Sequence, residues 1–271
     1  LNIVTDFQFK VIGTDDAYFS ISCKFFKNLG IVEGVLQDIT KQRRALEEVK
    51  SINNELDTFL YRASHDLRAP LTTILGLTEL IKIEENKVEI KNYNEKIKER
   101  VSSLDTLLKN LSLIAYNNAV PSVKKVFNLK ETLSSILQKY SSRYPLTKCK
   151  LVTQSDLQLI HSDEERITIL LNNLIENAFK FSVDCNLHPF VVIELKLINE
   201  HYQISVRDNG QGIAPENLTD IFKLFFKAAI SNNGSGLGLY LVKSIIHKLE
   251  GEIAVNSEIG KGTEFIVTIP A

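Results

Sequence analysis

The sequence predicts a multidomain protein in which an α-helical hairpin, forming a dimeric four-helix bundle, is followed by an α/β domain with a mixed sheet. Three observations lead to this prediction. Apolar residues alternate three and four apart over much of residues 41–117. After Pro121 the pattern changes to helical segments mixed with strand-like ones. Two of those strands, Phe190–Ile198 and Tyr202–Asp208, follow each other as in an antiparallel hairpin.

The composition is that of an ordinary globular chain. Of 271 residues, 44% are hydrophobic and 24% are charged, and the net charge is −1. At roughly 150 residues per domain, the length suggests about two domains. Near neutrality argues against nucleic-acid binding and against a polybasic membrane anchor. No apolar run approaches ~18 residues, so we expect no membrane contact by this segment.

The three cysteines predict neither a disulfide framework nor a zinc site. Cys23, Cys149 and Cys185 are widely spaced and form no Cys-x-x-Cys pair. A reducing, cytoplasmic location is the simplest expectation, and the sequence leaves open whether the parent protein is anchored in a membrane. Because the chain begins with Leu1 and contains no Met, we expect a fragment.

Residues 1–39 contain two β-like runs, Tyr18–Phe26 and Ile31–Ile39, which is too little to fold as a domain. From Thr40 the heptad spacing predicts one helix over about Lys41–Lys82, roughly 60 Å long at ~1.5 Å per residue. Asn53 on its seam either fixes register or is a tolerated surface residue. The seam is Leu46, Val49, Asn53, Leu56, Leu60, Ala63 and Leu67.

A second helix is predicted over about Ile90–Asn117, and the polar turn Glu84–Lys87 joins it to the first as a hairpin. A lone hairpin leaves half of its apolar stripe in water, so we expect a homodimer that pairs two copies into a four-helix bundle. The second seam is Ile97, Val101, Leu104, Leu108, Leu111 and Ala115.

The remainder, residues 121–271, predicts an α/β domain whose sheet is at least partly antiparallel, which disfavours a doubly wound parallel fold. The predicted helices are Asn128–Ser142, Asp163–Phe181 and Leu237–Leu249. The predicted strands are Cys149–Thr153, Leu157–His161, Phe190–Ile198, Tyr202–Asp208, Glu252–Asn256 and Gly262–Ile269.

One histidine on the first helix stands apart. His65 lies off the seam and faces outward, and Pro70 should kink the helix just beyond it. A neutral imidazole is a competent nucleophile, and the adjacent Asp66 could fix its tautomer and accept the released proton. Taken alone, an exposed His beside an Asp is more often an ordinary surface pair.

Two boxes in the α/β domain could hold a nucleotide. Asn173, Asn177 and Lys180 share one helix face, and an Asn amide oxygen such as that of Asn177 suits Mg²⁺. The alternative is that this helix face is ordinary solvent-exposed surface with no ligand. Asp208 ends a strand and could accept a hydrogen bond from an adenine amine, with Gly210 and Gly212 letting a ligand approach the backbone. The alternative is that the residues after Asp208 form a simple Asn-Gly turn with no role in binding.

Two further glycine-containing motifs lie in the C-terminal part of the chain. Gly234, Gly236 and Gly238 precede an apolar helix, where free N–H groups and the helix dipole favour phosphate. The pattern is not a dinucleotide-binding fingerprint, because Leu239 occupies the place of the third glycine. Gly260-Lys-Gly262-Thr263 then leads into the last strand.

The order of these boxes resembles the bacterial two-component sensor histidine kinases over about residues 41–271. The resemblance implies an ATP-binding α/β sandwich of the gyrase and chaperone type, ATP and Mg²⁺ as ligands, and a response regulator receiver domain as the partner in trans. It implies phosphorylation of His65 with Asp66 as its acid/base partner, and Asn177 as the Mg²⁺ ligand. The other implied ATP contacts are Asn173, Lys180, Asp208, Gly210, Gly212, Phe225, Lys227, Gly234, Gly236, Leu237, Gly238 and Thr263, with residues 228–233 as a lid.

The resemblance also implies domain boundaries and two departures. Residues 1–39 look like the C-terminal remnant of a PAS-like sensor domain, 40–120 like the coiled coil and phosphotransfer hairpin, and 121–271 like the catalytic domain. Ala69 stands where many members carry Thr or Asn, which implies weak phosphatase activity. Asn173 stands where gyrase-type ATPases carry a Glu base, which disfavours a conformational ATPase. A nucleotide-binding pseudokinase remains a second alternative.

Overall fold

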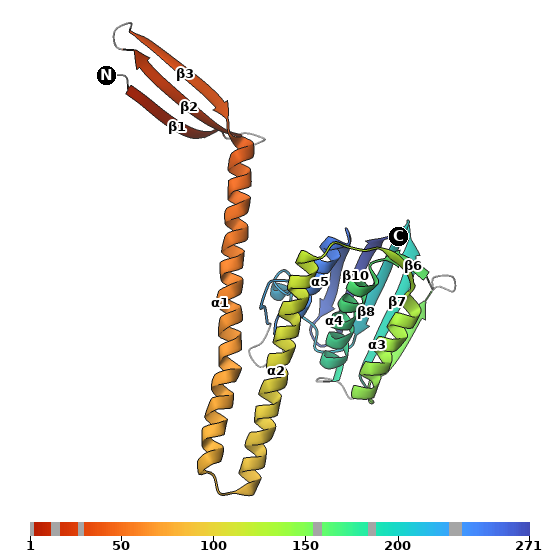
Figure 1. Ribbon diagram of the computed structural model, residues 1–271. Helices are drawn as coiled ribbons and strands as arrows, with labels where there is room; N and C mark the ends of the chain where they lie inside the picture. Colours follow the sequence, from red (N-terminus) through yellow and green to blue (C-terminus); the bar gives the residue numbers. More distant parts are fainter. Residues whose placement is uncertain (1–2, 12–16, 27–29, 154–158, 184–187, 228–234) are drawn as a thin grey trace. The chain divides into compact units, whose positions relative to one another are not determined.

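The computed structural model describes residues 3–11, 17–26, 30–153, 159–183, 188–227 and 235–271. Contacts within the chain define two compact units, residues 1–65 and residues 66–271. The boundary between the two units falls inside the first helix, so this helix contributes residues to both (Figure 1).

The first unit begins with an antiparallel sheet of three strands in the order β1-β2-β3. The strands are β1 (Ile3–Val11), β2 (Ala17–Phe26) and β3 (Ile31–Asp38). The latter two were predicted. β1 was not, although Phe7 and Phe9 alternate with polar residues along it, as in a half-buried strand. Residues 1–39 therefore contain a paired sheet rather than two isolated runs.

The first helix, α1 (Thr40–Ile83), starts directly from this sheet. The Asp38 carboxylate accepts a hydrogen bond from the Thr40 N–H at 2.8 Å, and the Tyr18 N–H donates to the Thr40 hydroxyl at 2.9 Å. Hydrogen bonding to the Thr40 side chain, and secondarily to the Thr40 backbone N–H, lowers the pKa of Asp38. The single long helix is confirmed, and it runs on through Pro70.

The second helix, α2 (Lys87–Ala119), begins at Asn86, whose side chain accepts the Val88 N–H at 2.9 Å. With residues 66–83 of α1 it forms the predicted hairpin (Figure 1). Among the described residues, no helix is both long and apolar enough to cross a membrane.

The α/β part contains a five-stranded mixed sheet in the order β5-β7-β8-β10-β9. Only β5 and β7 pair in parallel; the other three pairings are antiparallel, as the fold class requires. Asn199 and Glu200, with φ of 49° and 61°, make the tight turn of the predicted β7–β8 hairpin. The strands are β5 (Lys148–Thr153), β7 (Phe190–Ile198), β8 (His201–Asp208), β9 (Glu252–Glu258) and β10 (Gly262–Pro270).

A separate two-stranded ribbon pairs β4 (Lys125–Asn128) with β6 (Leu159–Ser162). β4 was not predicted, because four residues are too few to show a period. The strand predicted over Leu157–His161 is β6, and residues 157 and 158 lie outside the described part of the chain.

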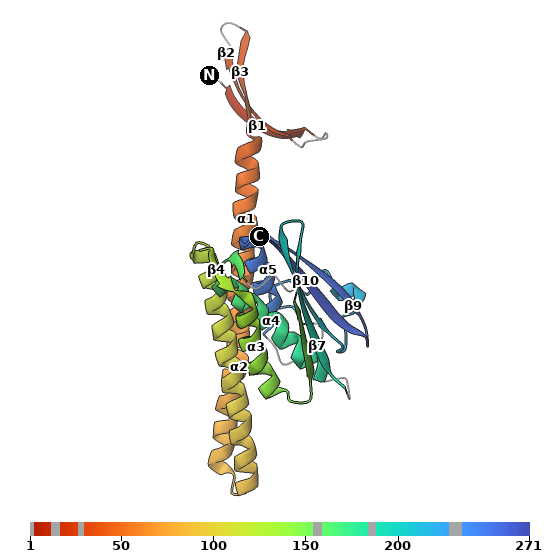
Figure 2. The same ribbon diagram turned by 90° about the vertical axis from the view of Figure 1, so that its right-hand side faces the viewer.

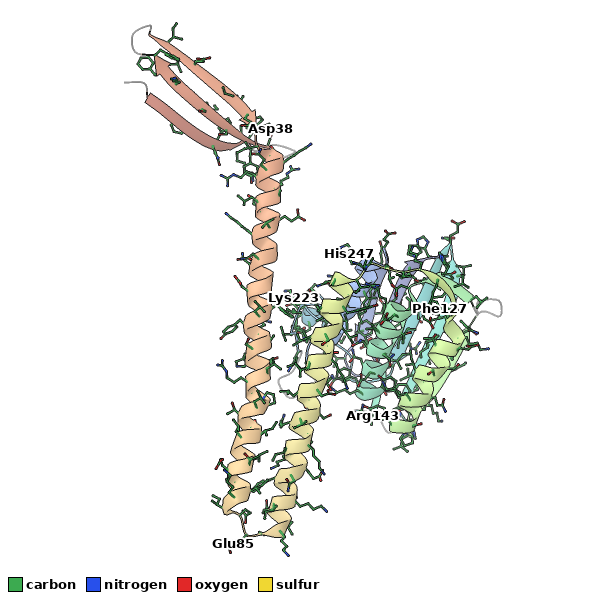
Figure 3. All side chains as sticks on the ribbon, in the orientation of Figure 1. Asp38, Glu85, Phe127, Arg143, Lys223 and His247 are labelled. Atoms are coloured by element: carbon green, nitrogen blue, oxygen red, sulfur yellow. The ribbon has the colours of Figure 1, made fainter. Side chains whose placement is uncertain are left out.

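Three helices, α3 (Leu129–Arg143), α4 (Glu164–Val183) and α5 (Gly238–Lys248), lie on one face of the five-stranded sheet (Figure 2). All three were predicted, and a 3-10 turn, η1 (Pro215–Asn217), was not. The side chains that fill the space between helices and sheet form one apolar core (Figure 3). Leu170, Leu171 and Leu174 of α4 are at its centre, each fully buried.

The core extends beyond the predicted boundary near Pro121. Leu107 and Ile114 of α2 are only 5% exposed and belong to the same cluster of buried residues. The predicted seam residues Val101 and Leu108, in contrast, are 50% and 46% exposed. Helix α2 thus has two apolar stripes, one buried against the α/β part and one open in the single chain.

Candidate functional site

The Asn face of α4 adjoins the start of α5. The Asn173 amide nitrogen donates to the Ile169 carbonyl at 2.8 Å. The Asn173 amide oxygen lies so close to Gly238 that a Cβ there would be only 2.8 Å away. Asn177 and Lys180 follow on the same helix, and both are half-buried. The structure therefore brings the Asn-containing face of α4 and the glycine box before α5 (Gly234, Gly236 and Gly238) together at Gly238.

Asp208 ends β8 and is only 6% exposed. One carboxylate oxygen accepts hydrogen bonds from the Gly210 N–H at 2.7 Å and the Thr263 N–H at 3.3 Å. Burial raises the pKa of Asp208 to about 6, although these two hydrogen bonds act in the opposite direction. A carboxylate held by neutral N–H groups in a buried place is a typical feature of functional sites.

Gly210 and Gly212 are required for packing of the chain itself. A Cβ at Gly210 would lie 2.4 Å from the Phe181 carbonyl oxygen, and one at Gly212 would lie 2.1 Å from the Glu258 carbonyl oxygen. Backbone therefore occupies the position that a side chain would take at each glycine, and this close packing holds the loop that follows Asp208. Approach of a ligand to the backbone at Gly210 and Gly212 stays a prediction.

The glycine box before α5 packs against an aromatic segment, Phe222, Phe225 and Phe226, that precedes it in the chain. Gly236 has a φ of 69°, and a Cβ there would lie 2.6 Å from the carbonyl carbon of Phe225. Phe225 itself has a φ of 60°, an unusual conformation for a bulky residue. Leu237, which precedes α5, is fully buried. Gly234 and the lid expected at residues 228–233 lie outside the described residues.

Thr263 and Lys227 are the remaining predicted contact residues that the structure describes. The Thr263 side chain is 6% exposed, and its hydroxyl lies 2.8 Å from that of Ser257. The rings of Phe222 and Phe265 meet edge to face, with their centres 6.4 Å apart. Lys227 is exposed at the end of the aromatic segment.

Ser235 was not singled out from the sequence, although it stands between two glycines of the box. Its hydroxyl oxygen accepts a hydrogen bond from the Leu237 N–H at 3.3 Å and another from the Asn110 side chain at 3.0 Å. Asn110 is on α2, so a helix of the hairpin contacts the glycine box directly. A hydroxyl inside a glycine-rich run before a helix is the signal that could have indicated this role.

His65 is exposed on α1, as predicted. Asp66, the next residue of the helix, is partly exposed. An imidazole that is open to solvent on a helix can react with a second group brought to it, which a core histidine cannot do.

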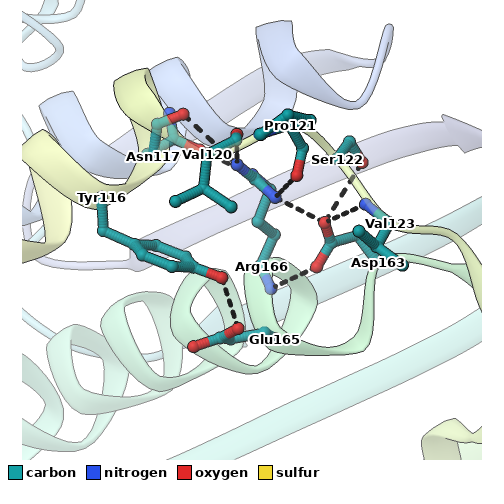
Figure 4. Close-up of polar contacts among 9 residues, drawn as sticks. All are labelled: Tyr116, Asn117, Val120, Pro121, Ser122, Val123, Asp163, Glu165 and Arg166. Carbon is teal, nitrogen blue, oxygen red and sulfur yellow. Dashed lines mark hydrogen bonds and ion pairs between the residues drawn. The ribbon is translucent and has the colours of Figure 1, made fainter.

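A buried polar joint fastens α2 to α4, and the sequence did not indicate it (Figure 4). The Arg166 side chain is only 1% exposed. Its guanidinium donates to the Asp163 carboxylate at 2.5 Å, to the Asn117 amide oxygen at 2.9 Å and to the Val120 carbonyl at 2.6 Å. It therefore pairs with Asp163, the residue directly before α4, and also caps the carbonyl end of α2.

Asn177 is suited to bind a metal ion that a bound nucleotide also coordinates. The described residues contain no group of three or more His, Cys, Asp or Glu placed to hold a metal. The Asn177 amide supplies one hard oxygen ligand on the half-buried face of α4. That donor chemistry fits Mg²⁺, which completes its coordination with water and phosphate oxygens.

Two family models match successive parts of the chain. Residues 55–118 match the "His Kinase A (phospho-acceptor) domain", and residues 162–271 match the "Histidine kinase-, DNA gyrase B-, and HSP90-like ATPase". The first match contains the helix with His65, and the second contains Asn177, Asp208 and the glycine box. The chain belongs to the sensor histidine kinases.

Relatives of this sensor histidine kinase span much longer sequences. The "Autoinducer 2 sensor kinase/phosphatase LuxQ" of Vibrio vulnificus strain YJ016 is 33% identical over 262 residues, which are 89% of this chain and 30% of the relative. The "Methanogenesis regulatory histidine kinase FilI" of Methanothrix harundinacea is 30% identical over 226 residues, 82% of this chain and 25% of the relative. The chain therefore spans about a quarter to a third of the length of these two curated relatives.

Solved structures share the fold. The histidine kinase AdeS of Acinetobacter baumannii has a TM-score of 0.62 at 24% identity, covering 76% of this chain and 97% of that one. The histidine kinase ThkA in complex with the response regulator protein TrrA has a TM-score of 0.66 at 20% identity, covering 98% of this chain and 78% of that chain. These likenesses agree with a helical hairpin followed by a mixed α/β domain.

Proposed function

We propose that the chain is the catalytic core of a protein-histidine kinase that transfers the γ-phosphoryl group of Mg-ATP to His65. The observation that carries the proposal is the contact between Asn173 of α4 and Gly238, the first residue of α5, in a domain that matches the ATPase family. The same chain carries an exposed histidine on a helix that matches the phospho-acceptor family.

In the proposed reaction, a neutral ring nitrogen of His65 attacks the γ-phosphorus of ATP. The bond from that phosphorus to the ADP oxygen breaks, and ADP leaves. Asp66 accepts the proton that the other ring nitrogen loses. In the second step, the bond between the His65 ring nitrogen and the phosphorus breaks as an Asp carboxylate oxygen of a separate response regulator bonds to that phosphorus. The imidazole takes back the proton held by Asp66 and leaves as the neutral ring.

Binding and positioning of ATP are assigned to the α/β domain. The Asp208 carboxylate accepts a hydrogen bond from the adenine amine, while Lys180 and the N–H groups before α5 bind phosphate oxygens. Lys227 provides a further point charge. Mg²⁺ held by Asn177 would supply neutralisation of phosphate charge. Gly210, Gly212, Gly234, Gly236, Leu237, Gly238, Thr263 and Phe225 complete the proposed set.

The main rival is an ATP-hydrolysing conformational ATPase, which shares this nucleotide fold. Such enzymes need a base that activates water, and the implied position holds Asn173, whose amide has no basic lone pair. His65 offers a nucleophile instead. A pseudokinase that binds nucleotide without phosphorylation is the second alternative, and the test below separates it.

We also propose a homodimer with a four-helix bundle. Its support is the open stripe of α2, where Val101 and Leu108 are about half exposed in the single chain. Substitution of both Val101 and Leu108 by Asp would place charges on the stripe and should convert the dimer to a monomer. Analytical ultracentrifugation measures the change. Val126, which is 64% exposed away from the seam, provides the control substitution to Asp. A dimer that persists in the seam variant would contradict the proposal.

The remaining assignments follow the same proposal. Residues 1–39 are assigned as the C-terminal part of a PAS-like sensor domain, 40–120 as the coiled coil and phosphotransfer hairpin, and 121–271 as the catalytic domain. Because ATP is an intracellular substrate, we place this core in the cytoplasm. The receiver domain docks on the exposed apolar surface near Leu71 and Leu75.

Ala69 leads to a proposal about the reverse function. A methyl side chain cannot orient water for hydrolysis of the phosphorylated regulator, so phosphatase activity should be weak. The substitution Ala69→Thr should raise the rate of regulator dephosphorylation, with autophosphorylation measured in parallel. An unchanged rate of dephosphorylation would contradict this assignment.

The decisive experiment is incubation with ATP labelled at the γ-phosphate. The native chain should take up label that is stable in base and labile in acid, as expected for phosphohistidine. His65→Gln should take up none and still bind nucleotide, and His161→Gln is the matched control on β6. Label in the His65 variant would refute the assigned site. Nucleotide binding without labelling of the native chain would identify a pseudokinase.

A further inference from the structure

The N-terminus of α5 is already occupied by a side chain from within the glycine box. Leu237 is the residue before α5, and its N–H is one of the donors that a helix N-terminus offers to phosphate. In the structure this N–H donates to the Ser235 hydroxyl oxygen at 3.3 Å. A phosphate oxygen can use the same N–H only after the hydroxyl has moved away.

Asn110 stabilises that arrangement from α2. Its side-chain nitrogen donates to the same Ser235 oxygen at 3.0 Å. The hydroxyl oxygen therefore accepts from the Leu237 N–H and from Asn110 at once, which uses both of its lone pairs. Rotation of the Ser235 side chain away from Leu237 would break the bond to Asn110 as well.

Helix α2 holds Asn110 firmly in place. Ile114, one turn further along, is 5% exposed in the shared core, and Asn117 donates to the Ser244 hydroxyl of α5 at 2.8 Å. The end of α2 is fixed by the buried Arg166 joint (Figure 4). The bond between Asn110 and Ser235 thus belongs to a contact between α2 and the α/β domain that buried side chains and further hydrogen bonds support.

We propose that Asn110 is a positioning residue that lowers the affinity of the domain for nucleotide phosphates by holding the Ser235 hydroxyl over the Leu237 N–H. The inference rests on the proposed ATP site. Binding of a polyphosphate displaces the hydroxyl and breaks its bond to Asn110, so the contact of α2 with the glycine box and phosphate binding oppose each other. Recognition of adenine at Asp208 does not involve these atoms and is unaffected.

The test compares ligands that differ only in phosphate. Dissociation constants for adenosine, Mg-ADP and Mg-ATP are measured by calorimetry on the whole chain. Loss of one hydrogen bond corresponds to roughly 3- to 10-fold in affinity. Asn110→Ala should therefore bind ADP and ATP roughly 3- to 10-fold more tightly than the native chain, with the adenosine constant unchanged.

Two further variants distinguish positioning from a merely structural effect. Ser244→Ala removes the neighbouring hydrogen bond between α2 and α5 but leaves the glycine box intact, so its ratio of ATP to adenosine affinity should equal the native ratio. Ser235→Ala should tighten ADP binding as Asn110→Ala does, and the double variant should add nothing. Thermal unfolding of each variant checks that all are folded.

Several outcomes would overturn the inference. ATP affinity in Asn110→Ala could stay equal or fall, or adenosine affinity could change by the same factor. Weaker ATP binding by Ser235→Ala would mean that the hydroxyl itself binds phosphate. Failure of the proposed function is distinguishable, because in that case the native chain binds no nucleotide or leaves His65 unlabelled.

Discussion

Asp163 and Asp208 are both buried acids of the α/β domain, 4% and 6% exposed, but their surroundings differ. Burial would raise the pKa of Asp163, yet hydrogen bonds from the Arg166 N–H and guanidinium and from the Val123 N–H outweigh it and lower the pKa. Within the described part of the chain, the Asp208 carboxylate accepts from two backbone N–H groups, and burial raises its pKa to about 6.

The different surroundings of Asp163 and Asp208 indicate different roles for the two buried carboxylates. The Asp163 carboxylate accepts hydrogen bonds from Ser122 and Val123, which follow α2, and from Arg166 of α4, so its charge serves the fold. The Asp208 carboxylate lacks such compensation, and its ionised form costs stability at neutral pH. A group kept in a costly state is expected where a ligand supplies the missing partner.

The largest expected effect comes from breaking the compensated pair. Arg166→Ala leaves the Asp163 charge buried without its cation and removes the donor to the carbonyl end of α2. We expect a loss of about 3–5 kcal/mol in the free energy of unfolding, measured by denaturant titration. Arg143→Ala is the control, because its pair with Glu176 is 3.7 Å long and largely exposed, and it should cost less than about 1 kcal/mol. Similar losses in both variants would contradict the comparison.

A smaller effect of opposite sign is expected at Asp208. Asp208→Asn removes the buried charge, and a pKa raised from 3.8 to about 6 corresponds to a gain of about 2–3 kcal/mol in stability at pH 8. The same variant should bind ATP roughly 10- to 100-fold more weakly, because it loses a charge-assisted hydrogen bond to adenine. Denaturant titration and calorimetry measure the two changes, and lower stability of the variant would show that the native carboxylate is compensated after all.

The pH dependence sharpens the contrast further. Because the folded-state pKa of Asp208 is raised, its cost is absent below about pH 4 and develops as the pH rises through 6. The stability gap between Asp208→Asn and the native chain should therefore close on acidification, and native ATP affinity should fall below pH 6. Asp163 has a lowered pKa, so its stabilising contribution persists through this window and is lost only at lower pH. A gap that stays constant from pH 8 to pH 4 would contradict the assignment to Asp208.

Most of the fold could be predicted from periodicity. The spacing of three and four residues predicted both hairpin helices to within a few residues, and alternation predicted β7, β8 and β10. The exposed position of His65 followed from its place relative to the seam. These predictions worked because each depends on which face of a single element is apolar.

The remaining features depend on contacts between distant segments. A seam analysis assigns one apolar stripe to α2, so the second stripe with Leu107 and Ile114 was missed. Arg166 was unremarkable in sequence, because an arginine near a helix start is ordinarily solvated. The bond between Asn110 and Ser235 joins residues 125 positions apart, and local pattern cannot indicate such a pairing.

The buried joint at Arg166 also decides how this protein can be recombined with others. A chimaera cut at Pro121 would transfer the sheet and its helices but leave behind Leu107, Ile114 and Asn117, so the grafted piece would expose apolar surface and carry an unsatisfied guanidinium. A graft that begins ahead of Leu107 would take these partners along. The exchangeable module of this kinase therefore includes the second half of α2.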